Sequence, residues 1–315
     1  MPKLYDQVAA QRKPDWLKIR LHRSTDYAAV RRIVDEHGLH TICSSGRCPN
    51  QSDCRSRRTA TFLILGDVCT RGCRFCATHT GQPLPPDPDE ARRVAESIAR
   101  MQLRYAVVTS VTRDDLPDGG ARAWAATVEA IRTVNPHTAI ELLIPDLDAR
   151  PELLATVVAS QPDIIGHNIE TVERLTPAVR ARAKYRTSLE TLRLLAEQGA
   201  TTKSGLMVGL GETDTEVLQT LGDLREAGVQ IVTIGQYLRP TLAHWPGARY
   251  VTPEQFEPYR RQALEMGFRY CASAPLVRSS YLAEEALRSV EQGAGKTFRA
   301  TGSAARKAQQ AREQR

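Results

Sequence analysis

Short hydrophobic runs alternate with longer amphipathic stretches from residue 60 onward. Runs of aliphatic and β-branched residues predict strands, whereas apolar residues that recur every three or four positions predict helices. The predicted strands begin at Ala60, Tyr105, Thr138, Asp163, Thr201 and Gln230. The predicted helices lie near 88–102, 121–133, 151–160, 186–198, 214–227 and 253–266. This alternation is typical of six βα units around a parallel sheet.

Polar and glycine-rich residues directly follow the predicted strands. They form the segments GDVCTRGC, TRDDLPDGG, PDLD, HNIET, GLGET and GQYLRP. Parallel βα units build either a doubly wound sheet or a full or partial barrel, and periodicity alone does not choose between these architectures. In each of them, ligands bind at the carboxyl ends of the strands. We therefore expect these segments to converge on one site.

This pattern divides the chain into four segments. Residues 1–59 form an N-terminal extension that carries three cysteines, and residues 60–268 form the βα body. Residues 269–292 return to the body with a last candidate strand, RYCASAPLV. Residues 293–315 hold six Lys and Arg against one Glu, and we expect a frayed or disordered tail there. Attraction of this tail to an acidic partner is the alternative.

Composition excludes several classes of protein. The chain of 315 residues is 41% hydrophobic and 25% charged, as is usual for a soluble globular protein. No apolar run is long enough to span a bilayer, and the first residues, MPKLYDQVAAQRKPDW, lack the apolar core of a signal peptide. We therefore expect a cytoplasmic protein with no membrane partner.

The net charge of +7 is the feature that points toward nucleic acid. Residues 293–315 carry +5 of it, which leaves +2 for the rest of the chain. A zinc-dependent nucleic-acid-binding module is therefore an alternative, but the sequence has no aromatic-rich basic platform. We expect no nucleic-acid partner.

Six of the seven cysteines lie within a window of 34 residues. In a reducing compartment, such a cluster is more typical of metal binding or redox chemistry than of disulfides. Cys69, Cys73 and Cys76 have the spacing C-x3-C-x2-C, which can hold three corners of a cubane iron–sulfur cluster. The fourth iron then stays open to a molecule that carries an amine and a carboxylate. A zinc knuckle completed by His79 is the alternative.

The other three cysteines of the window, Cys43, Cys48 and Cys54, have the spacing C-x4-C-x5-C, which also suits many zinc sites. Beside the later group, this spacing favours a separate metal centre. Its fourth ligand must come from another part of the chain or from a substrate. Cys271, on the last candidate strand, is interpreted as a small buried hydrophobic residue.

Phe75 stands before the last cysteine of the later group, as in the C-x3-C-x-aromatic-C loop of the radical S-adenosylmethionine superfamily. From Trp16 to Tyr281, the chain resembles the lipoyl synthase family of that superfamily. The matching segments are CPN, ATFLILGDVCTRGCRFC, VVTSVTRDDLPDGGA, HNIETVERL, KSGLMVGLGE, TIGQYLRP, RYVTPEQF and PLVRSSY. The resemblance implies an α/β fold, a partial (β/α)6 barrel of the TIM type, with a cysteine-bearing N-terminal extension and a C-terminal extension.

The resemblance also implies two four-iron (4Fe-4S) clusters. The C-x3-C-x2-C residues, called the SAM-cluster cysteines below, hold the cluster that cleaves S-adenosylmethionine. The C-x4-C-x5-C residues, called the auxiliary cysteines below, hold an auxiliary cluster. Its fourth ligand is a serine of the RSSY segment, for which Ser280 is preferred to Ser279. An alkoxide is a hard ligand among soft thiolates, which suits a cluster that is dismantled in use.

The implied activity is that of a sulfurtransferase. Reductive cleavage of S-adenosylmethionine gives methionine and a 5′-deoxyadenosyl radical, which abstracts hydrogen from carbon 6 and then carbon 8 of an octanoyl chain on a carrier lysine. Each carbon radical takes a sulfide of the auxiliary cluster, so this cluster is a substrate as well as a cofactor. The nearest alternative is a radical S-adenosylmethionine enzyme that uses its auxiliary cluster only for electron transfer.

Protein partners follow from the same resemblance. The carriers are the lipoyl domains of 2-oxoacid dehydrogenases and the H protein of the glycine cleavage system. An electron donor must reduce the first cluster, and an iron–sulfur cluster carrier must rebuild the auxiliary one. We expect the enzyme itself to be a monomer.

The S-adenosylmethionine site is predicted over the strand ends. Asn168 and Glu170, in HNIET, are placed to bind polar groups of methionine or ribose. Gly209 and Gly211 resemble a loop that lets the backbone approach a nucleotide, and Glu212 is placed to accept from a hydroxyl or an amine. For both glutamates, a surface carboxylate is the alternative.

Further residues are assigned by position. Phe75 belongs to the predicted cofactor site, and Tyr237 is predicted to pack on adenine. Arg278 is predicted to hold the auxiliary-cluster region or to contact the octanoyl chain. His167 and His244 are interpreted as loop or core residues. The segment TRDDLPDGG allows two interpretations, a capped structural loop and a substrate-positioning loop.

A few positions depart from the usual family pattern. Ser44 and Ser45 stand where acidic and small residues are common, and Arg55 stands where an aromatic residue is common. Gly247 replaces a branched residue. The spacing of the cysteines is unchanged, so these differences concern packing around the auxiliary cluster and contacts with the partner.

Overall fold

The structure is a computed structural model that describes residues 13–18, 25–56, 60–281 and 283–293. The tail predicted for residues 293–315 lies outside the described residues except for Gly293, which ends the last helix. The beginning of the N-terminal extension lies outside them as well.

One eight-stranded sheet forms the frame, in the order β1-β2-β5-β6-β7-β8-β9-β10. Strand β1 runs antiparallel to β2, and all other neighbours are parallel. The strands are β1 (His40–Thr41), β2 (Thr61–Ile64), β5 (Tyr105–Ser110), β6 (Ala139–Leu143), β7 (Ile164–Gly166), β8 (Thr202–Val208), β9 (Ile231–Gln236) and β10 (Tyr270–Ser273). A separate parallel pair consists of β3 (Val68–Cys69) and β4 (His79–Thr80). The six predicted strands and the last candidate strand are confirmed.

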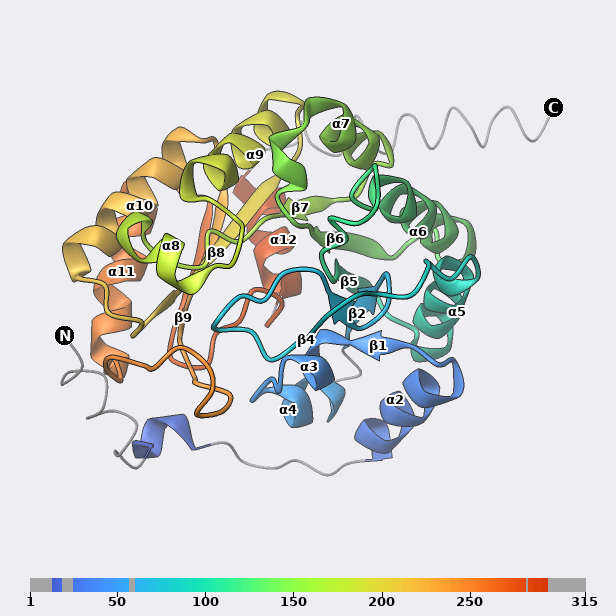
Figure 1. The fold of residues 1–315 in the computed structure, drawn as a ribbon, viewed down its shortest axis with the longest axis horizontal. Helices are drawn as coiled ribbons and strands as arrows, with labels where there is room; N and C mark the ends of the chain where they lie inside the picture. The colour runs from blue at the N-terminus through green and yellow to red at the C-terminus, as the bar shows by residue number, and fades with distance from the viewer. Residues whose placement is uncertain (1–12, 19–24, 57–59, 282, 294–315) are drawn as a thin grey trace.

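Helices surround the strands on the outside, as Figure 1 shows. The outer helices are α5 (Glu90–Met101), α6 (Ala121–Val134), α7 (Pro151–Ala159), α9 (Tyr185–Glu197), α10 (Asp214–Glu226) and α11 (Pro253–Glu265), which confirm the six predicted helices. The remaining helices are α2 (Thr25–Glu36), α3 (Ile42–Ser45), α4 (Gln51–Ser56), α8 (Thr176–Val179), α12 (Ala283–Gly293) and the short 3-10 helices η1 (Asp15–Leu17), η2 (Leu147–Ala149) and η3 (Glu173–Leu175). Strands β1 and β10 end the strand order without pairing, so the predicted partial barrel is confirmed. Among the described residues, no helix is long and apolar enough to cross a bilayer.

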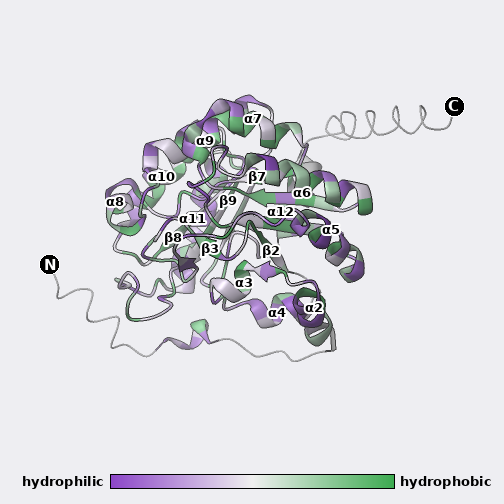
Figure 2. Cartoon of the chain, turned by 45° about the vertical axis from the view of Figure 1, so that its right-hand side comes forward, coloured by the Kyte–Doolittle hydropathy of each residue, from purple (hydrophilic) through white to green (hydrophobic). Residues whose placement is uncertain are grey.

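The amphipathic pattern explains how the outer helices pack. On α5, the buried residues Val94, Ile98 and Met101 recur every three or four positions and face the sheet. Figure 2 shows hydrophilic and hydrophobic residues in turn along the outer helices. One hydrophobic cluster joins β2, β5 and β6 to α5, α6 and α7, and a second joins β8 and β9 to α9, α10 and α11. The core therefore lies between the sheet and the ring of helices.

Helix α12 closes the amino end of the barrel. Ala286 and Val290 pack against Ile164 and Ile231, which are the first residues of β7 and β9. The first residue of the helix packs against Tyr105, at the start of β5. Figure 1 shows α12 inside the ring of outer helices. The opposite end, at the carboxyl ends of the strands, is the one at which barrels of this kind bind ligands.

A buried ion pair also stabilises the barrel interior. Lys203 Nζ, on β8, lies 2.7 Å from Glu141 Oε1, on β6, and both side chains are almost fully buried. The hydroxyl of Tyr105 donates to the other oxygen of Glu141. These contacts join β5, β6 and β8 and satisfy the charges that the sheet encloses.

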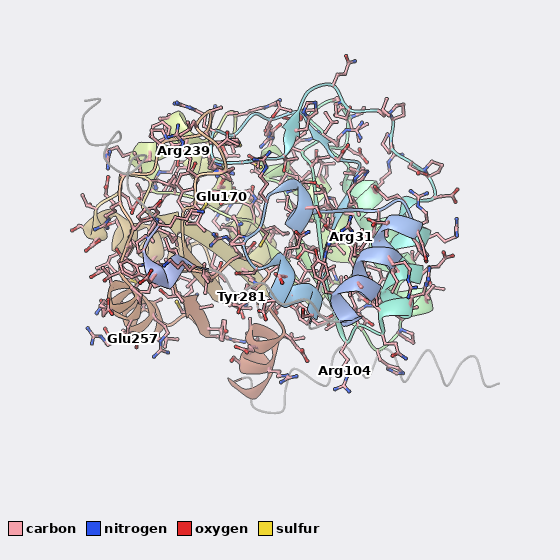
Figure 3. The ribbon with its side chains drawn as sticks, turned by 90° about the horizontal axis from the view of Figure 1, so that it is seen from below. Arg31, Arg104, Glu170, Arg239, Glu257 and Tyr281 are labelled. Atoms are coloured by element: carbon pink, nitrogen blue, oxygen red, sulfur yellow. The ribbon has the colours of Figure 1, made fainter. Side chains whose placement is uncertain are left out.

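The two ends of the sheet are joined by chain segments from opposite ends of the sequence. Residues 274–281 cross β9 at Gly235, where a Cβ atom would lie 2.2 Å from the carbonyl oxygen of Val277. The Asn50 side chain donates to the carbonyl of Leu276 at 2.7 Å. The Tyr281 hydroxyl donates to Asp53 at 3.2 Å, and Figure 3 shows Tyr281 beside the N-terminal helices. The absence of a side chain at position 235 thus permits this closure.

Substitution of Gly235 by alanine tests that contact. The added methyl group meets backbone rather than a flexible side chain, so residues 274–281 must shift. We expect Gly235→Ala to lower the free energy of unfolding by about 1–3 kcal/mol, measured by chemical denaturation. The matched control is Gly222→Ala, because a Cβ atom at this position of α10 meets open space. The control should gain about 0.5–1 kcal/mol, and an equal gain in both variants would contradict the contact.

Candidate active site

The loop that carries the SAM-cluster cysteines begins at Cys69, the last residue of β3, and is held by backbone contacts. Its ends are paired by the β3–β4 ladder, and Gly81 donates its N–H to the carbonyl of Cys69 at 3.1 Å. The sulfur of Cys69 accepts the backbone N–H groups of Arg71 and Thr112, each at 3.4 Å. Hydrogen bonds of this kind stabilise a thiolate and tune the potential of a bound cluster.

The side chains of Cys73 and Cys76 lie in the same electrostatic environment. Burial is the main cause that raises the pKa of each thiol, and the charges of neighbouring thiolates and of Glu170 raise it further. The guanidinium of Arg180 acts in the opposite direction on the pKa of Cys73. The structure therefore brings the SAM-cluster cysteines together with two charged residues from the region after β7.

Arg71 fastens this cysteine loop to the ends of two strands. Its guanidinium donates two hydrogen bonds to Asp114, at 2.8 and 2.7 Å, and one to Asp146, at 2.9 Å. Asp114 follows β5, and Asp146 follows β6. Burial raises the pKa of Asp146, but the hydrogen bond and charge of Arg71, together with the charge of His167 and the N–H of Asp148, hold this pKa below its ordinary value.

The neighbouring acidic residues of TRDDLPDGG also pair with groups of the protein itself. Asp115 pairs with Arg113 at 2.8 Å. Asp118 accepts the N–H groups of Gly120 and Arg122 at the start of α6. Of the two interpretations of this segment, the geometry favours the capped structural loop.

The residues after β9 cover the cysteine loop from the other side. The N–H of Trp245 donates to the carbonyl of Arg74 at 2.7 Å, and the guanidinium of Arg74 lies 4.6 Å from the centre of the Trp245 ring. His244 Nε2 lies 3.0 Å from the carbonyl of Cys76, which can only accept, so this nitrogen carries the proton. His244 is thus a loop residue that contacts the backbone of a SAM-cluster cysteine.

Tyr237 contacts the same segment after β9 that covers the cysteine loop. Its ring is buried in the core cluster of β8 and β9, with 3% of the residue exposed. Its hydroxyl donates to the carbonyl of Trp245 at 2.8 Å. Contact with adenine stays a prediction, and this geometry does not favour it. Phe75 is partly buried against the same core cluster, beside Cys76.

The polar residues after β7 form the part of the site best suited to a ligand. Glu170 has a φ of +68°, a strained value for a residue with a side chain, and strain of this kind is concentrated at functional sites. Burial raises its pKa, while Arg180 and a hydrogen bond from Asn168 act in the opposite direction. Figure 3 shows Glu170 in the interior of the molecule rather than at its rim.

Polar side-chain atoms in this region are buried without a hydrogen-bond partner. They are Oδ1 of Asn168 and Nε of Arg180, and Oγ1 of Thr171 is a third such atom in the same region. Another nitrogen of Arg180 donates to Ser188 Oγ at 2.8 Å, and His167 contacts the same hydroxyl at 2.9 Å. Buried atoms without partners in native proteins call for a ligand or a water. The sequence prediction did not include Arg180, because nothing in its neighbours marks a residue after a short helix as part of the site.

The residues of loop 209–212 hydrogen-bond to one another. The carboxylate of Glu212 accepts the N–H groups of Gly209, Leu210 and Gly211 at 2.7, 2.8 and 3.1 Å. Gly209 has a φ of +94°, and a Cβ atom there would lie 2.2 Å from Gln236 Nε2. These glycines and the glutamate are therefore needed by the loop itself. Their contact with S-adenosylmethionine stays a prediction that the geometry does not favour.

The auxiliary cysteines and the RSSY segment line one cavity. Its lining residues are Cys43, Cys48, Asn50, Cys54, Ala60, Thr61, Arg278, Ser280 and Tyr281. The thiols of Cys43 and Cys48 share a hydrogen bond. This bond is the main cause that lowers the pKa of Cys43 to about 6 and raises the pKa of Cys48. Of the two serines of RSSY, Ser280 is the one that lines the cavity.

The charges beside this cavity fit an anionic cluster. Arg55 is 6% exposed and Arg278 is partly buried, and neither has an ion pair with a carboxylate of the described residues. Burial lowers the pKa of Arg278, and the charge of Cys48 opposes that shift. Arg55 donates to Ser44 Oγ at 3.1 Å, so two of the departures from the family pattern contact each other. A cluster bound by three thiolates and a serine oxygen would carry negative charge. That charge would balance the guanidinium groups of Arg55 and Arg278.

The side chains are not arranged around a single metal ion. No three His, Cys, Asp or Glu residues of the described ranges are grouped closely enough to bind one ion. His79, the fourth ligand in the zinc alternative, is exposed on β4. A four-iron cluster places each cysteine on a different iron, so its ligands stand farther apart than those of zinc.

Comparison with known proteins decides the family. Residues 63–224 match the Radical SAM superfamily, a range that includes the SAM-cluster cysteines. The lipoyl synthase of Bacteroides fragilis is 57% identical over 277 residues, which cover 88% of this chain and 96% of that relative. The chain belongs to the lipoyl synthase family. The lipoyl synthase of Chlorobium phaeovibrioides is 53% identical over 274 residues, which cover 86% of this chain and 96% of that relative.

Solved structures agree with this member of the lipoyl synthase family in fold. Methylornithine synthase (PylB) has a TM-score of 0.51 at 11% identity, covering 88% of this chain and 83% of that chain. The FeFe-hydrogenase maturase HydG from Carboxydothermus hydrogenoformans has a TM-score of 0.52 at 13% identity, covering 84% and 78%. As a lipoyl synthase family member, the chain is a radical S-adenosylmethionine sulfurtransferase that uses S-adenosylmethionine and a four-iron cluster.

Arg71→Gln tests how the SAM-cluster loop is held. The variant leaves Asp146, with a side chain 2% exposed, without its counter-charge. We expect the free energy of unfolding at pH 7 to fall by about 3–5 kcal/mol, measured by denaturant titration under anaerobic conditions. A control is Arg186→Gln, which breaks an ion pair with Glu173 whose side chains are 70% and 52% exposed and should cost less than about 1 kcal/mol.

The difference in the free energy of unfolding between the wild type and Arg71→Gln should depend on pH. Because Arg71 holds the folded-state pKa of Asp146 below its unfolded value, the stabilisation is complete above the unfolded value and is lost as the pH falls through the folded one. The difference between the two proteins should therefore shrink as the pH falls below about 4 and disappear only below the folded-state pKa of Asp146. A difference that stays constant down to the acid limit of folding would show that the ion pair is not its source.

Proposed function

We propose that this enzyme inserts sulfur at carbons 6 and 8 of an octanoyl chain amide-linked to a lysine of a lipoyl carrier protein. The sulfur comes from an auxiliary four-iron cluster held by Cys43, Cys48, Cys54 and Ser280. The observation that carries this proposal is the cavity lined by all four of these residues. Family membership supports it independently.

The SAM-cluster cysteines provide three thiolates for the other four-iron cluster and leave one iron open. When bound, this cluster supplies the electron that cleaves S-adenosylmethionine to methionine and a 5′-deoxyadenosyl radical. Radical chemistry is needed because carbons 6 and 8 have no useful acidity, so a general base cannot remove their hydrogens. The protein's part is to hold the loop in place, which the contacts of Arg71 and His244 support.

Asn168, Glu170 and Arg180 would bind the polar groups of S-adenosylmethionine. The guanidinium of Arg180 has an unpaired Nε that suits the methionine carboxylate. Glu170 would accept hydrogen bonds from the amine or from a ribose hydroxyl. The unpaired Oδ1 of Asn168 provides a further acceptor beside it.

The auxiliary cluster acts as a substrate in this scheme. Its sulfides leave with the product, and an iron–sulfur cluster carrier rebuilds it between turnovers. Ser280 supports this use because an alkoxide binds iron as a hard ligand among soft thiolates and is the ligand most easily exchanged. Arg278 lies beside Cys48 and would hold the negative charge of the cluster.

The wider setting is proposed from the family. The carriers would be lipoyl domains of 2-oxoacid dehydrogenases and the H protein of the glycine cleavage system, and an electron donor is required. The sequence-based expectations of a monomer, of a cytoplasmic location and of no nucleic-acid partner stay predictions. The division of the chain at residues 59, 268 and 292 stays a prediction as well.

Iron and sulfide content provides the first test of the proposal. We expect about eight irons per chain after anaerobic reconstitution and about four in the Cys43/Cys48/Cys54→Ala triple variant. Mössbauer and optical spectra of both proteins would identify the clusters. Zinc in place of iron, or an unchanged iron content in the variant, would refute an auxiliary cluster at these residues.

Separate cysteine variants test the division of roles. Cys73→Ala should abolish cleavage of S-adenosylmethionine, because it removes a ligand of the first cluster. Cys48→Ala should keep part of the cleavage but form no lipoyl group on an octanoylated carrier peptide. Both activities are measured on the same reaction by chromatography and mass spectrometry. If the wild type forms 5′-deoxyadenosine and no sulfur-bearing product, the electron-transfer alternative is correct instead.

A further inference from the structure

Thr61 connects the sheet to the RSSY segment. It is the first residue of β2, is 4% exposed, and pairs with Val107 of β5. Its hydroxyl donates a hydrogen bond of 2.9 Å to Ser280 Oγ, although 219 residues separate the two. Both residues line the cavity of the auxiliary cysteines.

Ser280 depends on this hydrogen bond for its position. Among the described residues, Thr61 is the one side chain that hydrogen-bonds to the Ser280 hydroxyl. Ser280 stands in a turn closed by the N–H of Tyr281 and the carbonyl of Arg278, at 2.9 Å, and this turn does not fix its side chain. The backbone of Thr61, in contrast, is held in the sheet.

Thr61 also contacts an auxiliary cysteine. Its backbone N–H hydrogen-bonds to Cys43, while its hydroxyl hydrogen is donated to Ser280 Oγ. A single buried threonine therefore lies beside one sulfur and the one oxygen of the proposed ligand set. This placement on a rigid strand suits a group that orients ligands rather than one that reacts.

We propose that Thr61 is a positioning residue for Ser280. Its hydroxyl holds the serine oxygen at the edge of the cavity, both when that oxygen is bonded to iron and when it is not. The serine can then return to the same iron after release, and fewer other ligands reach that iron. This proposal rests on the auxiliary cluster site proposed above.

Thr61→Val removes the hydroxyl and keeps the shape of the side chain. The matched control is Thr109→Val on the neighbouring strand β5, because Thr109 is 5% exposed and its hydroxyl donates to the carbonyl of Leu143 at 2.9 Å, outside the cavity lining. Thr61→Ser keeps the hydroxyl, so its auxiliary cluster should lose iron at the wild-type rate. Ser280→Ala shows the result of losing the serine altogether.

The readout is loss of one iron from the auxiliary cluster, not enzyme activity. All variants are made in the full chain with Cys69, Cys73 and Cys76 replaced by alanine, so that the auxiliary cluster alone is present. After reconstitution and mild oxidation, the three-iron cluster is followed by electron paramagnetic resonance. We expect Thr61→Val to raise the initial rate of its formation about tenfold, toward the rate of Ser280→Ala, while Thr61→Ser and Thr109→Val stay near wild type.

A double variant separates this effect from general damage. If Thr61 acts through Ser280, Thr61→Val should add nothing to the rate in the Ser280→Ala background. An equal acceleration with and without Ser280, or a wild-type rate in Thr61→Val, would overturn the positioning role. Thr61→Ala serves as a second variant if Thr61→Val does not fold. If the unsubstituted auxiliary site binds no cluster at all, the proposed function fails first.

Discussion

The short strand β2 sets the positions of both cysteine groups. Its four residues are buried, and it pairs with β1 on one side and β5 on the other. It cannot shift without breaking hydrogen bonds to both neighbours. The auxiliary cysteines precede this strand, and the SAM-cluster cysteines follow it. A strand of this length spans about 13 Å, so the sheet keeps the two groups apart at a fixed separation.

The two groups differ in how their positive charges are balanced. Arg71 has the carboxylates of Asp114 and Asp146, so the SAM-cluster loop is held by partners within the protein. Arg55 and Arg278, beside the auxiliary cysteines, have no carboxylate partner among the described residues. A buried charge is unfavourable without a counter-charge. The two guanidinium groups would be balanced by the anionic auxiliary cluster proposed for this cavity.

Two side chains that are predicted to contact the ligand also have partners within the protein. Tyr237 was predicted on adenine from its place after a strand, yet its hydroxyl reaches the carbonyl of Trp245. Glu212 was predicted to contact the ligand, yet its carboxylate is used by the N–H groups of its own loop. Position after a strand identifies the correct edge of the sheet. It does not show whether a side chain points toward a ligand or back into the protein, because that depends on the path of the next loop.

The repeated βα units, the two cysteine groups and the superfamily loop around Phe75 could all be predicted from the sequence, because periodicity and spacing are local properties of a chain. The family resemblance predicts Ser280 beside the auxiliary cysteines, but the contact of Ser280 with Thr61 could be seen only in the folded chain, since it depends on closing the two ends of an open sheet across Gly235. The tertiary structure alone also placed Arg180 beside Cys73 and Glu170. Contacts between distant segments depend on how the whole sheet curves, and no short segment contains that information.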